Sequence, residues 1–462
     1  MSEKVLYLII YAIIVCLITI KAYIKKENLI YRALWTMFAV SAVFSVICKL
    51  DQGTFVGYGV LHNRWYDLSD TTWWAYALII VCNLIAFKPL KEFNKNDEIQ
   101  QFGSDVKMKK FFVEFAYIYL LFSLFYIITS LSIIRGVIGI SDFGALRASL
   151  FSNSENEGSA VMATNIISKM VFKLCLRFRF LSIFIAFAMI KERTKVYLAC
   201  LLIADTFFLY YLNCAATAAR GGLLIFVFII GVIGLIFFPY LSKANKRRVF
   251  IGGIIIFGIV FLFFMAVTLS RLASDKGGGN LLLRNISFYL GHAPIEFSKI
   301  TGSLTDFAWG KTILGRLASH FFKTPYSWPT ISNQIGFPDI GAVFVTYLGY
   351  MYTDFGAVGC IAFVLLWMLF TNYILKKRPN KISTIFFFLY YLSFYVTGNF
   401  TVGRLEFAAV TTTFVMYFVI RFIERAPALR RLFTAVSIDK YNTKEKVIGM
   451  KGNNNVWNSY QD

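Results

Sequence analysis

Charged residues are scarce in this chain. Only 16% of its 462 residues are charged, and acidic residues are the fewest, with 25 Asp and Glu against 47 Lys and Arg. No polar stretch is long enough to supply a soluble domain with a hydrophobic core. The 7 cysteines include no CxxC pair and fall in or beside apolar runs, so we interpret them as small buried side chains.

Hydrophobic residues instead make up 58% of the chain, in continuous runs of about 18 or more residues. In lipid, backbone polar groups must be satisfied within each segment, so such runs form helices, and their lack of alternation argues against a β-barrel. We predict an all-α polytopic integral membrane protein with about 11 transmembrane helices, roughly 10–12. The expected spans are 5–24, 30–49, 72–88, 111–134, 168–190, 196–214, 222–241, 250–269, 353–375, 383–398 and 405–423.

The distribution of Lys and Arg predicts how these spans are oriented. A net charge of +22 would also suit a nucleic-acid-binding protein, but most basic residues lie in alternate short loops and in the C-terminal tail. Because such loops are cytoplasmic, we place the N-terminus outside and the C-terminus inside, and expect no nucleic acid partner. Residues 1–425 would form the transmembrane domain, with 270–352 a long outer segment within it and 426–462 a cytoplasmic tail.

The outer segment 270–352 is not a single loop. Residues 281–300 carry apolar residues at helical spacing, which predicts a helix that lies flat on the membrane or caps the bundle. A glycine joint, a turn-rich stretch and a glycine-broken apolar stretch are expected at 277–279, 324–338 and 341–352. The three histidines of the chain, all on predicted outer parts, are His62, His292 and His320.

One predicted span carries several basic residues. They are Lys169, Lys173, Arg177 and Arg179. The first three repeat every fourth residue and form one stripe that runs inward from the outer face, whereas Arg179 points elsewhere. A charge at the centre of a span costs about 2.5–3.5 kcal/mol, so the stripe needs compensation. Either it pairs with Asp205 or Glu114 while reaching for the membrane surface, or it lines a groove for a phosphate-bearing lipid.

Two further arginines stand at the expected outer ends of spans. Arg220 lies in the small-residue sequence CAATAARGG, which permits a ligand to approach its guanidinium and the backbone closely. The positive end of the helix dipole also favours an anion there. Arg404, in GNFTVGRLEF, is a weaker case. The alternative for Arg220 is a helix-end arginine that reaches to the interface.

Together these features resemble a known family. The many spans, the late outer segment, the ARGG motif at 219–222 and the pattern T-Y-x4-Y-T-D-F-G-x2-G at 346–359 resemble the bacterial oligosaccharide repeat-unit polymerases. These are the O-antigen and capsule polymerases of the Wzy type. The match in organisation covers roughly residues 5–425.

The resemblance implies a glycosyltransferase C-like fold and a polymerase that acts at the outer face of the bacterial inner membrane. Such an enzyme transfers a growing glycan from undecaprenyl diphosphate to the non-reducing end of a repeat unit on a second carrier. The diphosphate is already a leaving group, so the resemblance implies no metal and no other cofactor. The implied partners are the lipid-linked oligosaccharide, membrane lipid and a chain-length regulator. The N-terminus would be periplasmic.

In that reaction the candidate residues have distinct roles. Arg220 would stabilise the leaving diphosphate, and a general base would deprotonate the acceptor hydroxyl. The catalytic candidates are Arg220, His292, His320 and Asp354, and the diphosphate- and lipid-binding candidates are Lys173, Arg177, Arg220 and Arg404. Asp354 would otherwise be a helix N-cap, and both histidines also fit ordinary structural positions.

Two other functions remain open. An O-antigen ligase or another lipid-linked-sugar glycosyltransferase would share this organisation, and C-class transferases carry acidic residues in the first outer loop. The corresponding residues here are Asp51, Asp67 and Asp70. A flippase or transporter is expected to contain two similar halves, and the sequence has no internal repeat.

Overall fold

The structure, a computed structural model, describes a large part of the chain. The described residues are 3–50, 71–93, 98–138, 165–216, 220–272, 281–312, 328–336, 345–377, 381–398 and 404–425. Their regular elements are α-helices and one 3-10 helix, which confirms the predicted all-α class. Several predicted features lie outside these residues. They are His62, His320, the three aspartates of the first outer loop, the glycine joint 277–279 and the tail 426–462.

Each predicted span coincides with an α-helix. These helices are α1 (Glu3–Ile24), α2 (Leu29–Leu50), α4 (Trp73–Ala86), α7 (Val106–Thr129), α10 (Ile166–Lys191), α11 (Val196–Ala216), α12 (Arg220–Phe237), α13 (Lys243–Leu272), α17 (Leu348–Lys377), α18 (Ile382–Gly398) and α19 (Arg404–Arg425). Among the residues described, 7 helices are long and apolar enough to cross a membrane, so the chain is a multi-pass membrane protein. The helix α10, with its basic residues, is not among the 7.

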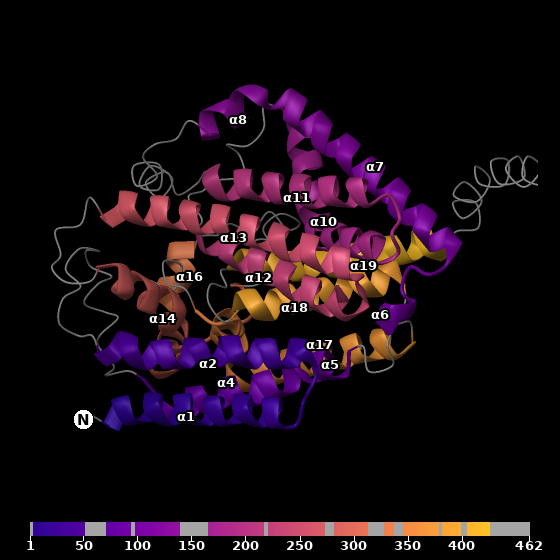
Figure 1. Cartoon of the computed structure of the whole chain (residues 1–462). Helices are drawn as coiled ribbons and strands as arrows, with labels where there is room; N and C mark the ends of the chain where they lie inside the picture. Colours follow the sequence, from indigo (N-terminus) through magenta and orange to yellow (C-terminus); the bar gives the residue numbers. More distant parts are fainter. Residues whose placement is uncertain are drawn as a thin grey trace, which may run out of the picture.

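The remaining elements are α5 (Lys88–Glu92), α6 (Glu98–Gln101), α8 (Leu131–Ile138), η2 (Phe238–Tyr240), α14 (Leu281–Ser303) and α16 (Trp328–Gln334). In Figure 1 the helices α8, α14 and α16 lie at the same end as the start of α1, whereas α5 and α6 lie at the end where α19 stops. The first long helix therefore begins, and the last long helix ends, at opposite ends of the bundle.

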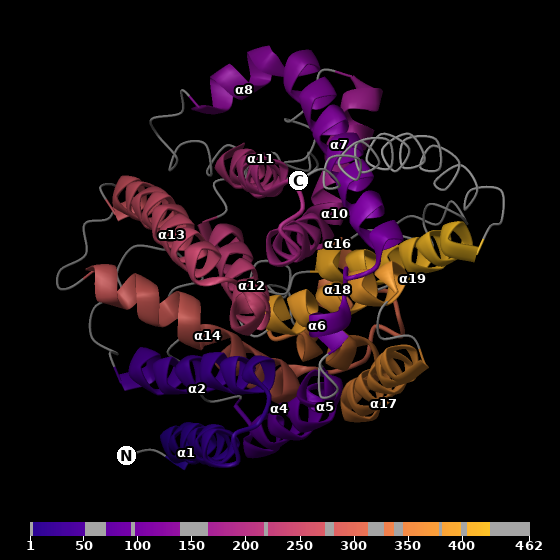
Figure 2. The same cartoon turned by 45° about the vertical axis from the view of Figure 1, so that its right-hand side comes forward.

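The long helices form two groups joined through the middle. Figure 2 shows α7, α10 and α11 on one side and α1, α2, α4, α14 and α17 on the other. Between them, α12 contacts both α10 and α2, and α18 contacts both α10 and α17. At the centre the ring of Tyr395 meets Tyr347 edge-on at 4.9 Å, and the Tyr347 hydroxyl donates to Asn83 at 3.0 Å. These aromatic contacts hold α4, α17 and α18 together.

Some predicted boundaries are wrong. The span expected at 111–134 begins at Val106 and ends at Thr129, because the chain leaves helical geometry at Ser130 (φ −118°, ψ 16°) before α8 starts. The helix α13 begins seven residues before the expected 250, at Lys243. Apolar runs mark where lipid contact starts, and a helix continues past that point wherever its charged end meets water.

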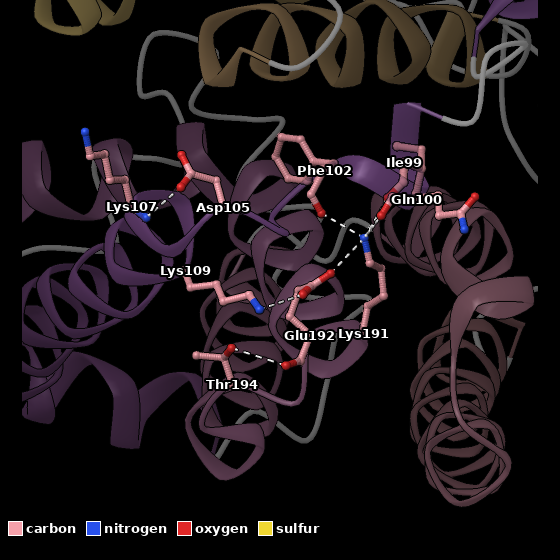
Figure 3. Close-up of polar contacts among 9 residues, drawn as sticks. All are labelled: Ile99, Gln100, Phe102, Asp105, Lys107, Lys109, Lys191, Glu192 and Thr194. Atoms are coloured by element: carbon pink, nitrogen blue, oxygen red, sulfur yellow. Dashed lines mark hydrogen bonds and ion pairs between the residues drawn. The ribbon is translucent and has the colours of Figure 1, made fainter. Parts of the chain in front are cut away.

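A buried lysine ties the turn after α10 to the region of α6. The Lys191 ammonium donates to the backbone carbonyls of Ile99 and Phe102, each at 2.9 Å, and to that of Gln100 (Figure 3). It also pairs with Glu192 at 3.0 Å, and Lys109 of α7 pairs with the same carboxylate at 2.9 Å. The positive charge of Lys191 is thus compensated by oxygen acceptors. These contacts, the Lys191 joint, fasten this end of the bundle.

Candidate functional site

The helix α14 packs closely against α2. Ser45 Oγ donates to the Gly291 carbonyl at 2.5 Å, and a Cβ at position 291 would overlap the backbone carbonyl of Phe44. Residues 291–300 are all buried. The predicted helix at 281–300 is therefore confirmed. Of the two placements expected for it, flat on the membrane or capping the bundle, its buried face and its contact with α2 favour packing against the bundle.

The buried half of α14 carries polar side chains. His292 and Glu296 lie on one face, one turn apart, and are 2% and 1% exposed. Lys299 Nζ lies 3.5 Å from Glu296 Oε1, and both side chains are shielded from solvent. Ser298 holds this half of α14 to the start of α4, accepting from Thr72 N at 2.9 Å. The imidazole of His292 is thus part of a polar layer inside the bundle.

The helix α17 is interrupted at Gly356. This residue has φ 65° and ψ −162°, a conformation that glycine adopts without strain. The interruption frees the carbonyls of Thr353 and Asp354 from helical hydrogen bonding. They accept instead from the N–H groups of Ala308 at 2.9 Å and Trp309 at 3.2 Å. The span expected to start at 353 therefore contains a break at Gly356, between a short helical stretch from Leu348 and the long helix that ends at Lys377.

The Asp354 side chain contributes to the same contact between α17 and the segment that contains Ala308 and Trp309. It is 0% exposed, and its Oδ1 accepts from Thr312 N at 3.0 Å. Thr312 Oγ1 donates in turn to the Tyr350 carbonyl at 3.2 Å. The carboxylate therefore ties residues 308–312 to α17. Its role as a general base stays a prediction.

The segment bound to Asp354 contains a tight turn. Lys311 N donates to the Ala308 carbonyl at 3.0 Å, and the two central residues, Trp309 and Gly310, have φ of 51° and 84°. Positive φ at both central residues is the type I′ pattern, which glycine, asparagine and aspartate favour. A tryptophan there costs about 1–2 kcal/mol of backbone strain.

The basic stripe of α10 has no acidic partner in the described part of the chain. Lys173 is exposed, and Lys169 and Arg177 are half-buried. The two carboxylates considered as partners are engaged elsewhere. Asp205 accepts from Ser123 at 2.6 Å, and Glu114 pairs with Lys110 at 3.6 Å. The pairing explanation thus finds no support among these contacts.

Arg179 is a residue whose importance the sequence did not reveal. Its guanidinium lies 4.3 Å from the Phe180 ring and 5.1 Å from the Tyr210 ring, and its Nη1 donates to the Leu176 carbonyl at 2.6 Å. The Tyr210 hydroxyl lies 3.3 Å from the position of a Cβ on Gly222. Tyr210 therefore lies between Arg179 and the first turn of α12, where the ARGG motif ends.

Two predicted arginines occupy equivalent positions. Arg220 is the first residue of α12 and Arg404 the first residue of α19. Each stands at the positive end of a helix dipole, as the sequence predicted, but their side chains lie outside the described ones. The described residues contain no group of 3 or more His, Cys, Asp or Glu that could hold a metal ion.

Comparison with known proteins gives no relative. No protein-family model, no curated protein and no solved structure matches this chain.

Proposed function

We propose that this protein is a bacterial inner-membrane glycosyltransferase that polymerises lipid-linked oligosaccharide repeat units. Its donor would be a glycan on undecaprenyl diphosphate, and its acceptor the non-reducing end of a repeat unit on a second carrier. Transfer would occur at the periplasmic face, where the distribution of Lys and Arg predicts the long outer segment.

The observation that carries the proposal is the basic stripe of α10. Lys169, Lys173 and Arg177 lie on a helix of the bundle, and within the part of the chain that is described no carboxylate pairs with them. Cations in such a place are costly unless an anion compensates them. A lipid-borne diphosphate supplies that anion and reaches the stripe from the membrane.

The contact of α10 with α12 supports a single phosphate region. Both helices pack against each other and against α18, and α12 begins with Arg220. Departure of the diphosphate develops negative charge, and fixed cations aimed at that charge lower the barrier. In this scheme Arg220 stabilises the leaving group while Lys173 and Arg177 hold the carrier, with Arg404 as an auxiliary cation.

The acceptor hydroxyl requires a general base. His292 and Asp354 are buried, and Asp354 is bound to Thr312. His320 lies outside the described residues. Comparing His292→Ala, His320→Ala and Asp354→Ala at equal expression identifies the base; full activity in all three excludes this set.

The glycan ladder of a deletion strain tests the function. Loss of the gene should leave lipid-linked single repeats at the outer face and no long chains. Single repeats that accumulate on the cytoplasmic side identify a flippase instead. Long chains that form but stay on their carrier identify a ligase.

Substitution of Arg220 tests the phosphate site. Arg220→Ala should reduce chain growth about 10²–10³-fold, the usual effect of removing one donor to a developing charge. Arg135→Ala is the matched control, because Arg135 is an exposed arginine on α8 at the same end of the bundle. Normal chains from an inserted, stable Arg220→Ala protein contradict the assignment.

A further inference from the structure

Trp309 occupies a position that its residue type disfavours. It is the first central residue of the turn from Ala308 to Lys311, with φ 51°. Asparagine, aspartate or glycine would hold this turn without strain. The turn is nevertheless fixed, because Trp309 N donates to the Asp354 carbonyl at 3.2 Å. A rule of local structure broken at a rigidly held residue is typical of a functional position.

The strained backbone displays the indole instead of burying it. Trp309 is 67% exposed, although the backbone beside it is tied to α17. Phe307 meets the Trp309 ring edge-on, with centroids 6.0 Å apart and planes at 82°. Phe355, 41% exposed, lies against the turn, with its Cζ 3.3 Å from the position of a Cβ on Gly310. The result is an outward-facing aromatic surface supported from the side.

Exposed polar side chains able to bond hydroxyls lie in the stretch that carries Trp309 and in the stretch hydrogen-bonded to it. The exposed ones on the neighbouring backbone are Thr305, Asp306, Lys311, Asn333 and Gln334. The two stretches that carry them are joined, since Thr305 N donates to the Ile335 carbonyl at 3.2 Å and Lys311 Nζ to Gln334 at 3.3 Å. Asp306 would repel a phosphate, and the single lysine is already engaged, so the surface suits a neutral ligand rich in hydroxyls.

We propose that Trp309 and Phe355 form the platform on which a sugar ring of the acceptor glycan stacks. The apolar C–H face of the ring would lie on the indole, and Asp306, Asn333 and Gln334 would bond its hydroxyls. This inference rests on the proposed function for the identity of the glycan. It assigns the outer segment a task separate from the phosphate region: holding the acceptor.

A tryptophan that merely anchors the protein in the membrane interface has different requirements. Such a residue works from any backbone conformation and tolerates other aromatic side chains. It needs neither positive φ nor amide and carboxylate groups nearby. The observed arrangement fixes the backbone that carries the indole, which a specific ligand requires and a lipid surface does not.

The test uses the full-length protein in nanodiscs and the oligosaccharide repeat released by mild acid from the host's own lipid-linked repeat. Trp309→Asn is the decisive variant, because asparagine relieves the turn while removing the platform. It should melt at the same temperature as the wild type or higher, yet bind the oligosaccharide at least about tenfold more weakly. Trp73→Asn is the matched control: Trp73, at the start of α4, is 62% exposed, and its replacement should leave binding unchanged.

Binding is read by saturation-transfer NMR and by fluorescence quenching. The platform is overturned if Trp309→Asn binds as the wild type does, or if the wild type does not bind. It is equally overturned if brominated lipid quenches the Trp309 fraction of the fluorescence, which identifies a lipid anchor. Trp309-dependent binding in a protein whose deletion leaves the glycan ladder intact keeps the platform and rejects the polymerase. If deletion removes the long chains but the protein shows no Trp309-dependent binding, the polymerase is kept and the platform is rejected.

Discussion

Asp354 and Thr312, 42 residues apart in sequence, are joined by a hydrogen bond of 3.0 Å from the Thr312 backbone N–H to the Asp354 carboxylate. The bond connects the turn that displays Trp309 to the break in α17 at Gly356. Three backbone N–H groups, those of Ala308, Trp309 and Thr312, thus reach acceptors at the same broken helix end. The turn is therefore fixed to the part of α17 that precedes Gly356.

This relationship predicts how two substitutions at Asp354 differ. Asp354→Ala leaves the buried Thr312 N–H without this acceptor and should lower the free energy of unfolding by about 1–3 kcal/mol. Asp354→Asn keeps an amide oxygen in place and should retain both stability and chain length. Thermal unfolding in detergent and the glycan ladder measure the two effects. A stable Asp354→Asn protein without activity would instead identify Asp354 as the catalytic base.

Gly291 makes the contact between α14 and α2 possible. Gly291→Ala places a methyl group against the Phe44 backbone carbonyl, which cannot rotate away, and should cost about 3 kcal/mol of stability. Gly258→Ala on α13 is the control, because a Cβ there meets nothing within 4 Å, and it should be neutral or slightly stabilising. Equal melting temperatures for the two variants would show that the helices are not in close contact.

The basic stripe of α10 predicts loss of activity without loss of stability. Lys173→Met and Arg177→Met remove cations that have no ionic partner in the described residues, so the folded protein should be equally stable or more stable. Chain growth should fall at least about tenfold, because the carrier phosphate loses a ligand. Lys376→Met, at an exposed lysine near the end of α17, controls for net charge. Destabilisation by the stripe variants with normal chains would identify the stripe as structural.

The Lys191 joint predicts a dependence of stability on pH. Burial by itself raises the pKa of the Glu192 carboxyl, but hydrogen bonds from Lys109 and Lys191 outweigh it and bring the pKa below its ordinary 4.5. The stabilisation is therefore complete above the unfolded-state pKa and is lost as pH falls through the lower folded-state pKa. Melting temperatures should fall more steeply between about pH 5 and pH 3 for the wild type than for Glu192→Gln. Parallel curves would contradict this role.

The sequence was sufficient for the features that depend on lipid. Apolar runs predict where the long helices lie, and the resulting helices include all those expected. It also placed Arg220 and Arg404 at the ends of predicted spans, and each is the first residue of a helix. These inferences depend on local composition, which one sequence contains in full.

Other features depend on contacts between distant residues. Nothing near Gly291 indicates that it faces Phe44, and the partner of Asp354 lies in a different segment. Trp309 differs from these residues, because the residue preferences of its turn favour Gly, Asn or Asp at that position and not Trp. The sequence predicts that Arg179 points away from the stripe, but it does not predict what Arg179 contacts. The packing of α10 against α11 brings its guanidinium to the Tyr210 ring.

The break in α17 also decides where the chain can be divided in a chimera. The part of that helix before Gly356 satisfies its last carbonyls through the N–H groups of residues 308 and 309. A chimera that takes a foreign outer segment must therefore take the chain through Gly356 with it. A junction placed earlier would separate the N–H donors of residues 308 and 309 from their carbonyl acceptors at 353 and 354, and the chimera would lose these hydrogen bonds.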